Sequence, residues 1–317
     1  MNSIDEFISD IVCPCCLTKL SKSKDFLVCQ NTECCKSFPI INGIPVLINE
    51  EESVFNIQDF IESKDTTFNL KKSKIKSIAK KLIPSTSLNV GARENYKKLS
   101  FLLTKKNANP VVLVIGGSIL GEGMESIVNE PKIQLVESDV TFGPRTKIIF
   151  DAHSIPFPDE YFDCVIIQAV LEHVVDPFKC VDEVYRVLKK NGVVYAETPF
   201  IAQVHMGKYD FHRFTHLGHR RLFRNFEEIE SGAVCGPGMA LAWSYSYFIF
   251  SFFRSKRIRK LLIAFTSLTS FFLKYFDYYL IKKPGTYDAA LGFYFMGQKS
   301  DTVLDDRELL ELYRGLL

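Results

Sequence analysis

The pattern of apolar and polar positions predicts alternating strands and helices over the middle of the chain. Five short, β-branched runs have the composition of strands buried on both faces of a parallel sheet: 110–115, 133–136, 148–150, 162–167 and 193–198. Apolar side chains recur at helical spacing from Phe178 to Leu188, after an Asp176-Pro177 start, and the segment 189–192 has the composition of a helix end. Strand, helix and strand in succession predict an α/β fold that binds ligands at the carboxyl ends of its strands.

Polar residues and glycines follow these predicted strands. The turn from Gly116 to Gly123 comes directly after the first run, and glycines there let a backbone approach a nucleotide closely. Glu137 directly follows the second run and lies about 20 residues after the glycine turn. At this distance a doubly wound fold has the carboxylate that holds the two hydroxyls of a ribose. Asp151 follows the third run and is placed to accept a hydrogen bond from an adenine amino group. The ends of the last two runs carry further polar residues: Gln168, Glu172, His173 and Thr198.

The motifs around these residues resemble those of the class I S-adenosylmethionine-dependent methyltransferases of the type 11 group. The matching motifs are Asp151-Ala152, Ile155-Pro156-Phe157, Asp159, Phe162-Asp163, Leu171-Glu172-His173-Val174, Asp176-Pro177 and Arg186-Val187-Leu188-Lys189. The resemblance covers roughly 109–226 and implies a Rossmann-like, doubly wound, mostly parallel sheet of seven strands. The chain departs from the family at Val114, where an acidic residue is usual, and its loop is G-G-S-I-L-G rather than G-x-G-x-G.

The resemblance assigns roles to individual residues. The loop from Gly116 to Gly121 would approach the methionine part of S-adenosylmethionine, Glu137 would hold the ribose, and Asp151-Ala152 would meet the adenine. The complete expected cofactor site is Gly116, Gly117, Ser118, Gly121, Glu137, Asp151, Ala152, Gln168, Leu171, Glu172 and His173.

The segment after the fifth strand is expected to carry the catalytic residues. The family has a similar D-(Y/F)-x-R-F-T segment, which here contains Asp210 and Arg213. His205 is placed to take a proton from an attacking hydroxyl or amine near neutral pH. Arg213 would either bind an acidic group or pair with Asp210 and order the loop.

Other functions share parts of this pattern. A nicotinamide dehydrogenase also has the glycine turn, but the Leu171-Glu172-His173-Val174 motif has no role there. Val114 and the altered loop leave a non-catalytic scaffold that retained the fold as an alternative. Methylation of RNA is a second alternative, because some ribosomal-RNA methyltransferases also carry an N-terminal cysteine module.

The N-terminus contains a cysteine-rich module. Six of the nine cysteines lie from Cys13 to Cys35, and no hydrophobic signal segment opens the chain, so we expect a reducing, cytoplasmic location and a metal site rather than disulfides. Two cysteine knuckles can place four thiolates around one structural zinc ion. With the ending Phe38 to Leu47, the module resembles the zinc-ribbon proteins related to the activator subunit of eukaryotic methyltransferases. That resemblance favours Cys13, Cys16, Cys29 and Cys34 as zinc ligands, with Cys15 or Cys35 as substitutes.

Length and composition set the domain organisation. A chain of 317 residues with 47% hydrophobic and 24% charged residues is long enough for one large domain and a small module, and its net charge of +2 predicts no bulk affinity for polyanions. We expect a zinc-ribbon module at 1–52, a basic linker and helix at 53–108, and a methyltransferase domain at 109–317. The lysine-rich stretch 71–81 predicts a basic amphipathic helix, either a linker or a contact for anionic lipid or RNA.

The C-terminal third contains two aromatic segments inserted into the domain at about 238–282. The first is uncharged and leaves about 15 residues of helix, fewer than the ~20 needed to span a bilayer. The basic turn 254–260 joins it to the second. The pair would form a lid over an apolar substrate, a dimer interface or a peripheral membrane contact. A lipid-linked or cell-envelope glycan precursor is the acceptor that would explain both the aromatic residues and the cations.

Overall fold

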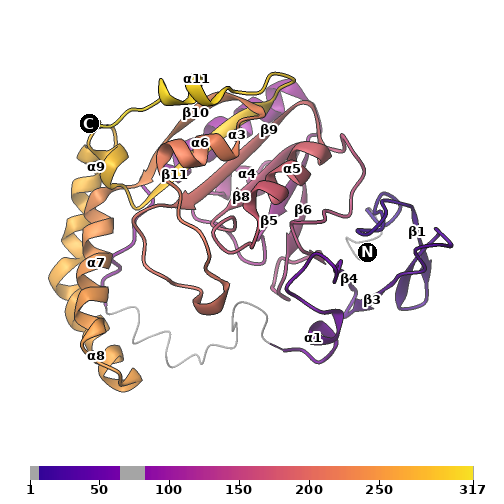
Figure 1. The fold of residues 1–317 in the computed structure, drawn as a ribbon, viewed down its shortest axis with the longest axis horizontal. Helices are drawn as coiled ribbons and strands as arrows, with labels where there is room; N and C mark the ends of the chain where they lie inside the picture. The colour runs from indigo at the N-terminus through magenta and orange to yellow at the C-terminus, as the bar shows by residue number, and fades with distance from the viewer. Residues whose placement is uncertain (1–6, 65–82, 317) are drawn as a thin grey trace.

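The computed structural model describes residues 7–64 and 83–316, and within them a single sheet of eleven strands is covered by helices (Figure 1). The strands lie side by side in the order β1-β2-β3-β4-β7-β6-β5-β8-β9-β11-β10. The central six, from β4 to β9, are parallel, whereas β11 is antiparallel to both of its neighbours. The strand bounds are β1 Leu20–Ser23, β2 Phe26–Cys29, β3 Ser37–Ile41, β4 Ile44–Leu47, β5 Val111–Ile115, β6 Gln134–Asp139, β7 Ile148–Phe150, β8 Phe162–Gln168, β9 Leu188–Pro199, β10 Phe226–Cys235 and β11 Gly292–Lys299.

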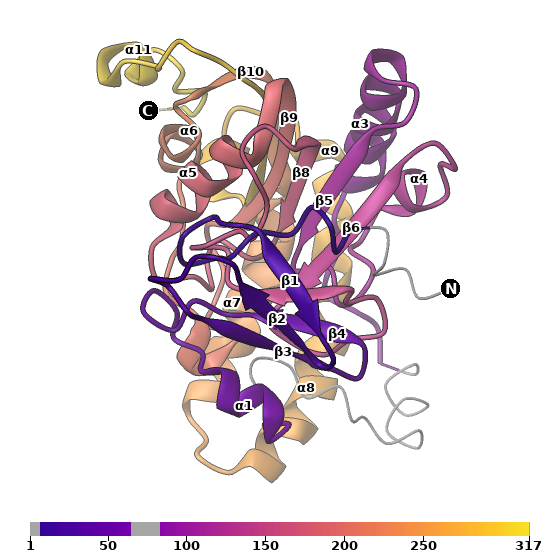
Figure 2. The ribbon, with the colours of Figure 1, turned by 90° about the vertical axis from the view of Figure 1, so that its right-hand side faces the viewer.

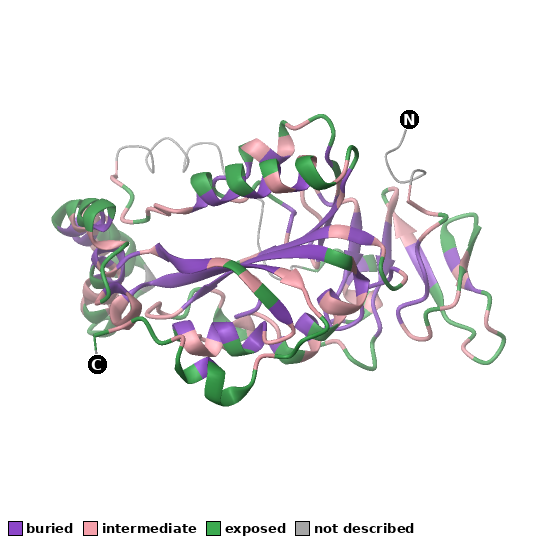
Figure 3. Ribbon diagram, turned by 90° about the horizontal axis from the view of Figure 1, so that it is seen from above, coloured by how far each residue is buried: buried purple, intermediate pink, exposed green. Residues whose placement is uncertain are grey.

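Helices cover both faces of this sheet. Their bounds are α1 Ile57–Ile61, α3 Ala92–Lys106, α4 Glu125–Val128, α5 Pro177–Val187, α6 His216–Leu222, α7 Pro237–Ser251, α8 Lys256–Ser270, α9 Asp277–Leu280, α10 Thr286–Ala289 and α11 Asp306–Leu310, with 3-10 turns η1 Gly207–Tyr209 and η2 Phe271–Phe276. The alternation along β5 separates two cores: Val112 and Val114 pack with α3 and α4, whereas Leu113 and Ile115 pack with α5. The result is the predicted three-layer α/β arrangement (Figure 3).

The prediction of seven strands was wrong for the sheet as a whole. The seven strands from β5 to β11 form a Rossmann-like, mostly parallel sheet, but the N-terminal module extends it by four. The extension begins where β4 pairs in parallel with β7, through Val46 opposite Ile149 and Leu47 opposite Phe150. Without the module, β7 would be an edge strand of the sheet. Pairing with β4 covers this edge and buries the apolar side chains of both strands. Figure 2 views the molecule from the side of the module, with β1 to β4 in front.

The predicted end of the central helix was also wrong. Asp176 caps α5 by accepting a hydrogen bond from the Lys179 amide, as the Asp-Pro start indicates, but the helix ends at Val187. The stretch 189–192 belongs to β9 instead, because Leu188 already pairs with Phe162 of β8. A register shift between Phe162 and Cys164 accommodates the extra residues as a bulge, with Asn191 at a φ of 61°.

The two aromatic segments form a helical hairpin between β10 and β11. Helix α7 has 15 residues, and α8, η2 and α9 return toward the sheet. The hairpin and the N-terminal module lie at opposite ends of the molecule (Figures 1 and 3). Within the residues that the structure describes, every helix is too short or too polar to cross a bilayer. The predicted basic helix at 71–81 falls in the gap at 65–82 and so lies outside the described residues.

Candidate functional site

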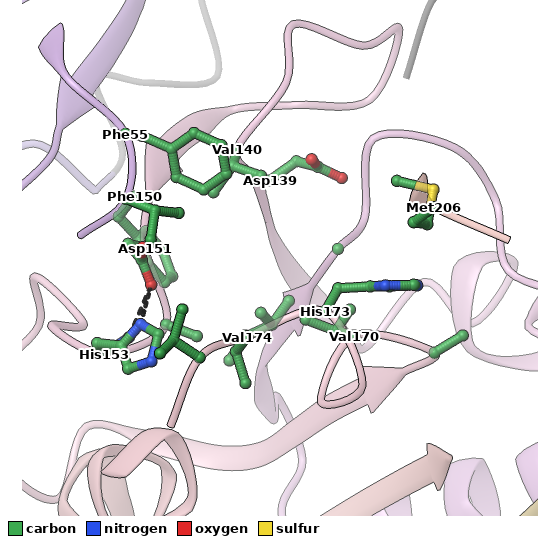
Figure 4. A pocket seen from close by; sticks show the side chains of 16 residues that line it. Phe55, Asp139, Val140, Phe150, Asp151, His153, Val170, His173, Val174 and Met206 are labelled. Carbon is green, nitrogen blue, oxygen red and sulfur yellow. Dashed lines mark hydrogen bonds and ion pairs between the residues drawn. The ribbon is translucent and has the colours of Figure 1, made fainter. Parts of the chain in front are cut away.

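Three cavities meet at the carboxyl ends of the parallel strands. The Asp139 cavity, of about 100 Å³, is lined by Asp139, Asp151 and His173 among others (Figure 4). The glycine-loop cavity, of about 370 Å³, lies along Gly116–Gly121, and the Trp243 cavity, of about 170 Å³, is lined by the end of β9 and by Trp243 of α7. Ala169, directly after β8, lines all three, so they adjoin one another.

The glycine loop is shaped by close contacts that exclude side chains. Gly116 has a φ of +78°, and a Cβ atom there would lie 2.4 Å from Cγ2 of Val170. The next two amides are held by β6, since Gly117 donates to the Ser138 carbonyl at 2.8 Å and Ser118 donates to the Asp139 carboxylate at 3.1 Å. The structure therefore brings together the four loop residues expected at the site, Gly116, Gly117, Ser118 and Gly121, all of which line the glycine-loop cavity.

The acidic residue at the end of β6 is Asp139 rather than Glu137. The strand was predicted to stop before Glu137, but Ser138 and Asp139 continue it by pairing with Ile148 and Ile149 of β7. Glu137 is buried in an ion pair with Arg145 at 2.6 Å and lines none of the three cavities, whereas Asp139 faces the first of them. Burial raises the pKa of Asp139, while bonds from Ser118 oppose that shift. Residues 137 and 139 share a face of the strand, so the sequence pattern alone does not separate them.

Asp151 lies at the end of β7 as expected, in a dense set of hydrogen bonds. Its carboxylate contacts Nδ1 of His153 at 2.5 Å and accepts from the Ser53 hydroxyl at 2.5 Å. Burial disfavours the charged carboxylate, but the bonds from His153 and Ser53 outweigh it and lower the pKa of Asp151. Ala152 follows in the same cavity wall.

The N-terminal segment after β4 also contributes to the Asp139 cavity, which the sequence did not reveal. Val54 and Phe55 line it, and the ring of Phe55 lies against that of Tyr209, with 5.5 Å between centroids and the planes tilted by 31°. Figure 4 shows Phe55 above Val140 and Asp151. The sequence around Phe55 does not indicate that this residue lines a cavity, because the contact depends on how the N-terminal module docks on the sheet.

Of two further residues expected at the cofactor site, Gln168 lines one of the three cavities and Leu171 lines none of them. Gln168 ends β8, lines the glycine-loop cavity and donates to Glu197 at 2.9 Å. Glu197 of β9 is buried, accepts from Asn89 and Tyr195 as well, and has a pKa raised by burial. Leu171 is fully buried in the core and lines none of the three cavities.

Glu172, His173 and His205 come together where the Asp139 and Trp243 cavities approach each other. Oε1 of Glu172 lies 3.6 Å from Nε2 of His173 and 3.9 Å from Nε2 of His205, and the two imidazoles meet edge to face at 4.9 Å. Burial raises the pKa of Glu172 to about 8 and lowers the pKa of His173 to about 4. His205 faces the Trp243 cavity, and His173 faces the Asp139 cavity.

Arg213 and Asp210 form a pair that orders the loop after β9. The Arg213 guanidinium bonds both carboxylate oxygens of Asp210 and the carbonyls of Ala202, Gln203 and His212. Burial works against the charge on Asp210, but the bonds from Arg213 and from the His205 amide dominate and lower the pKa of Asp210. With its donors engaged in this way, Arg213 fits the loop-ordering alternative better than binding of an acidic substrate group.

The four cysteines expected to bind zinc form one cluster. Sγ of Cys13 lies 3.8 Å from that of Cys34, and Sγ of Cys16 lies 3.5 Å from that of Cys29, with all four within 4.8 Å of one another. Thiolates bound tetrahedrally at 2.3 Å from zinc are separated by roughly 3.8 Å, so the cluster is compatible with a zinc site. The exposed Cys35 instead donates to the Thr32 carbonyl. A hydrogen bond from Thr18 contributes most to lowering the pKa of Cys16, to about 6, which favours a thiolate.

Comparison with known proteins supports a methyltransferase domain in this chain. A family model described as "Methyltransferase domain" matches residues 128–196. A ubiquinone/menaquinone biosynthesis C-methyltransferase UbiE from Pectobacterium carotovorum is 31% identical over 109 residues, which cover 33% of this chain and 40% of the relative. The UbiE protein of Saccharophagus degradans is 33% identical over 132 residues, covering 39% and 52%. The chain thus matches about half or less of the length of these relatives.

Solved structures with low sequence identity were also found. A Haemonchus contortus phosphoethanolamine N-methyltransferase 2 is 15% identical, with a TM-score of 0.40, 64% of this chain covered and 53% of that chain. The YcgJ protein of Bacillus subtilis is 17% identical, with a TM-score of 0.38, 66% of this chain covered and all of that one.

Proposed function

We propose that this protein is an S-adenosylmethionine-dependent methyltransferase. The observation that carries the proposal is the row of strand ends around one connected set of cavities: the tight turn at Gly116 after β5, Asp139 after β6 and Asp151 after β7. In a doubly wound sheet these positions bind a nucleotide-like ligand. The match of residues 128–196 to a methyltransferase domain narrows that ligand to the methyl donor.

The residues at the site fit this cofactor. Asp139 is a buried carboxylate facing a cavity, and its charge would be stabilised by the two ribose hydroxyls. The loop from Gly116 to Gly121 would take the methionine part, and Asp151, Ala152 and Phe55 would enclose the adenine. When bound, S-adenosylmethionine supplies an activated methyl group on a sulfonium. The protein would contribute mainly by holding an acceptor atom in line with that methyl.

The Trp243 cavity is the proposed acceptor site. It is lined by Thr198 and Pro199 of β9, by His205 and by Trp243, next to Ala169, where the cavities meet. Because Met239 and Trp243 of α7 line the glycine-loop and Trp243 cavities, the hairpin forms a wall of the site. This supports the lid alternative for the aromatic segments.

The outer face of the same hairpin favours a membrane-bound acceptor. Large apolar side chains along it are strongly exposed, among them Phe248 (62%), Phe252 (68%), Leu261 (76%) and Tyr279 (70%). Exposed cations lie in the turn between α7 and α8 and in the first turns of α8: Arg254, Arg257, Arg259 and Lys260. Apolar side chains beside cations complement the acyl boundary and phosphates of an anionic lipid surface. We therefore propose a lipid-linked acceptor that enters past α7.

Two measurements test the catalytic proposal. Calorimetry of the purified protein is expected to show binding of S-adenosylhomocysteine, and transfer of a radiolabelled methyl group is expected in the lipid fraction of a cell extract. Transfer to the RNA fraction would support RNA methylation instead. Binding without transfer to any fraction would favour the scaffold, and absence of binding would refute the proposal.

Flotation with vesicles containing phosphatidylglycerol tests the membrane contact. Wild-type protein should float at low salt. Replacing Arg254, Arg257, Arg259 and Lys260 with Gln should lower the affinity for the vesicles by up to roughly 1000-fold, at about 1 kcal/mol per cation, so that little protein floats. A matched variant replaces four exposed lysines elsewhere, Lys97, Lys105, Lys132 and Lys190, and should still float. Equal flotation of both variants, or a stable dimer in solution that remains unbound, would overturn this contact.

A further inference from the structure

A second cluster of metal-ligating side chains lies at the junction of the proposed cofactor and acceptor sites. Glu172 and His173 belong to the loop after β8, and His205 belongs to the loop after β9. Their donor atoms all lie within 4.8 Å of one another, and apart from the cysteines no other such group was found among residues 7–64 and 83–316.

The distances within this cluster suit ligands of one ion better than a hydrogen-bonded chain. The Glu172 oxygen lies 3.6 and 3.9 Å from the two Nε2 atoms, which is beyond the 2.7–3.2 Å range of hydrogen bonds of this kind. Nitrogen and oxygen ligands at about 2.1 Å from a common ion are separated by roughly 3.4 Å in tetrahedral geometry. A small adjustment of side chains would therefore bring the three atoms onto one ion.

The second nitrogen of each imidazole is already engaged. Nδ1 of His173 contacts the Tyr209 carbonyl at 2.7 Å, and Nδ1 of His205 contacts the Gln203 carbonyl at 3.2 Å. A carbonyl only accepts, so both Nδ1 atoms carry hydrogen, and in the neutral form of each ring the lone pair is on Nε2, the nitrogen nearer Glu172. This is how metal-bound histidines are usually fixed. Arg213 holds the Gln203 carbonyl at 3.0 Å, so the Arg213–Asp210 pair supports the arrangement.

Glu172 provides an independent sign of a missing ligand. Its side chain is 1% exposed, and Oε2 has no hydrogen-bond partner among the described residues. A carboxylate oxygen that is buried without a partner is costly, and native proteins rarely keep one without a bound group to satisfy it. The residue lines the Trp243 cavity, so an ion placed there would also be open to the acceptor.

We propose that Glu172, His173 and His205 bind one divalent first-row transition-metal ion, such as Zn²⁺ or Mn²⁺, that holds an oxygen of the methyl acceptor. Three protein ligands leave at least one coordination position open, as in catalytic metal sites. The ion would lower the pKa of an acceptor hydroxyl. The hydroxyl proton leaves to water, the oxygen forms a bond to the methyl carbon, and the carbon–sulfur bond breaks with its electron pair remaining on sulfur. This role rests on the proposed function, whereas binding of the ion does not.

The test counts metal ions per chain. Full-length protein is dialysed against Zn²⁺ and then against buffer, and bound zinc is measured by mass spectrometry. Wild type should hold two ions, one in the cysteine cluster, and the double variant His173→Ala/His205→Ala should hold one. The control His212→Ala changes a histidine in the same loop that bonds the Val175 carbonyl, and it should hold two.

A spectroscopic measurement identifies the second site. Wild type given one equivalent of zinc, which should fill the cysteine cluster first, is then titrated with Co²⁺ and should gain weak visible bands without the strong thiolate charge-transfer bands that cysteine ligation gives. The double variant should gain neither, and Glu172→Gln should bind Co²⁺ at least tenfold more weakly. Equal zinc content in wild type and double variant, or cobalt spectra showing thiolate ligation only, would overturn the metal site. Calorimetry with S-adenosylhomocysteine on wild type reports separately on the proposed function, and circular dichroism of each variant reports on correct folding.

Discussion

The two ends of the candidate site differ in how their polar groups are satisfied. At the cofactor end, Asp139 and Asp151 are buried but already accept hydrogen bonds, from Ser118 in one case and from His153 and Ser53 in the other. At the acceptor end, Oε2 of Glu172, Oγ1 of Thr198 and Oε1 of Gln203 are buried without a partner among the described residues.

This difference indicates which end is preorganised. A site whose carboxylates are fixed by neighbouring donors binds its ligand with little rearrangement. Buried polar atoms without partners are tolerated where a ligand completes them. The cofactor end is therefore preorganised in the protein alone. At the acceptor end, the buried polar atoms would gain their partners when an ion and an acceptor bind.

The largest expected effect on stability and cofactor affinity comes from Cys16→Ser, which removes one predicted zinc ligand from the N-terminal module beside the cofactor end. The variant should lose its zinc and lower the free energy of unfolding of the N-terminal module by at least about 3 kcal/mol, since structural zinc supplies much of the folding energy of such modules. Because β4 pairs with β7, affinity for S-adenosylhomocysteine should fall too. Denaturant unfolding, zinc content and calorimetry measure these changes.

Cys35→Ser is the matched control for the zinc ligand. Cys35 is exposed and its thiol donates to the Thr32 carbonyl, so zinc content, stability and cofactor affinity should stay close to wild type. If Cys16→Ser kept its zinc, the assignment of the four ligands would be wrong.

A smaller effect is expected from Asp139→Ala, which removes one carboxylate from the cofactor end. Hydrogen bonds to a charged group contribute about 1.5–3 kcal/mol, so affinity for S-adenosylhomocysteine should fall roughly 10- to 150-fold by calorimetry. Glu137→Ala is the matched comparison, two residues earlier on the same strand, and it should weaken binding much less because Glu137 pairs with Arg145. If Glu137→Ala weakened binding more than Asp139→Ala, Glu137 would be the residue that holds the ribose.

Much of the cofactor end could be predicted because it depends on local pattern. The glycine turn, the strand ends and the Asp-Pro helix start are set by residues close together in sequence, and the structure has them where the pattern placed them. The predicted end of this strand before Glu137 was wrong, because Ser138 and Asp139 continue β6 by pairing with β7. Pairing between strands is not visible in the sequence of one strand.

The features that were missed depend on contacts between distant segments. Phe55 reaches the Asp139 cavity only because β4 docks on β7. Trp243 lines the Trp243 cavity only because α7 packs against Ala202, in the loop after β9, and against Cys235 at the end of β10. In the sequence, Glu172 and His205 are separated by helix α5 and strand β9, so their spacing gives no metal motif. Such juxtapositions follow from topology rather than from periodicity.

The smallest expected effect tests whether the N-terminal segment takes part in cofactor binding or only covers the site. Ser53→Ala removes the hydroxyl that donates to Asp151 at 2.5 Å and leaves the fold of the module intact. The hydroxyl also accepts from the Phe55 amide at 3.1 Å. Both bonds lie within the protein and act on the cofactor only indirectly, so affinity for S-adenosylhomocysteine should fall about fivefold, or about 1 kcal/mol, while zinc content stays at the wild-type value. Ser21→Ala, at an exposed serine of β1, is the control and should change neither. If Ser53→Ala binds the cofactor as tightly as wild type, the segment from Ser53 to Phe55 contributes packing alone, and the preorganisation of the cofactor end comes from β5 to β7 without help from the module.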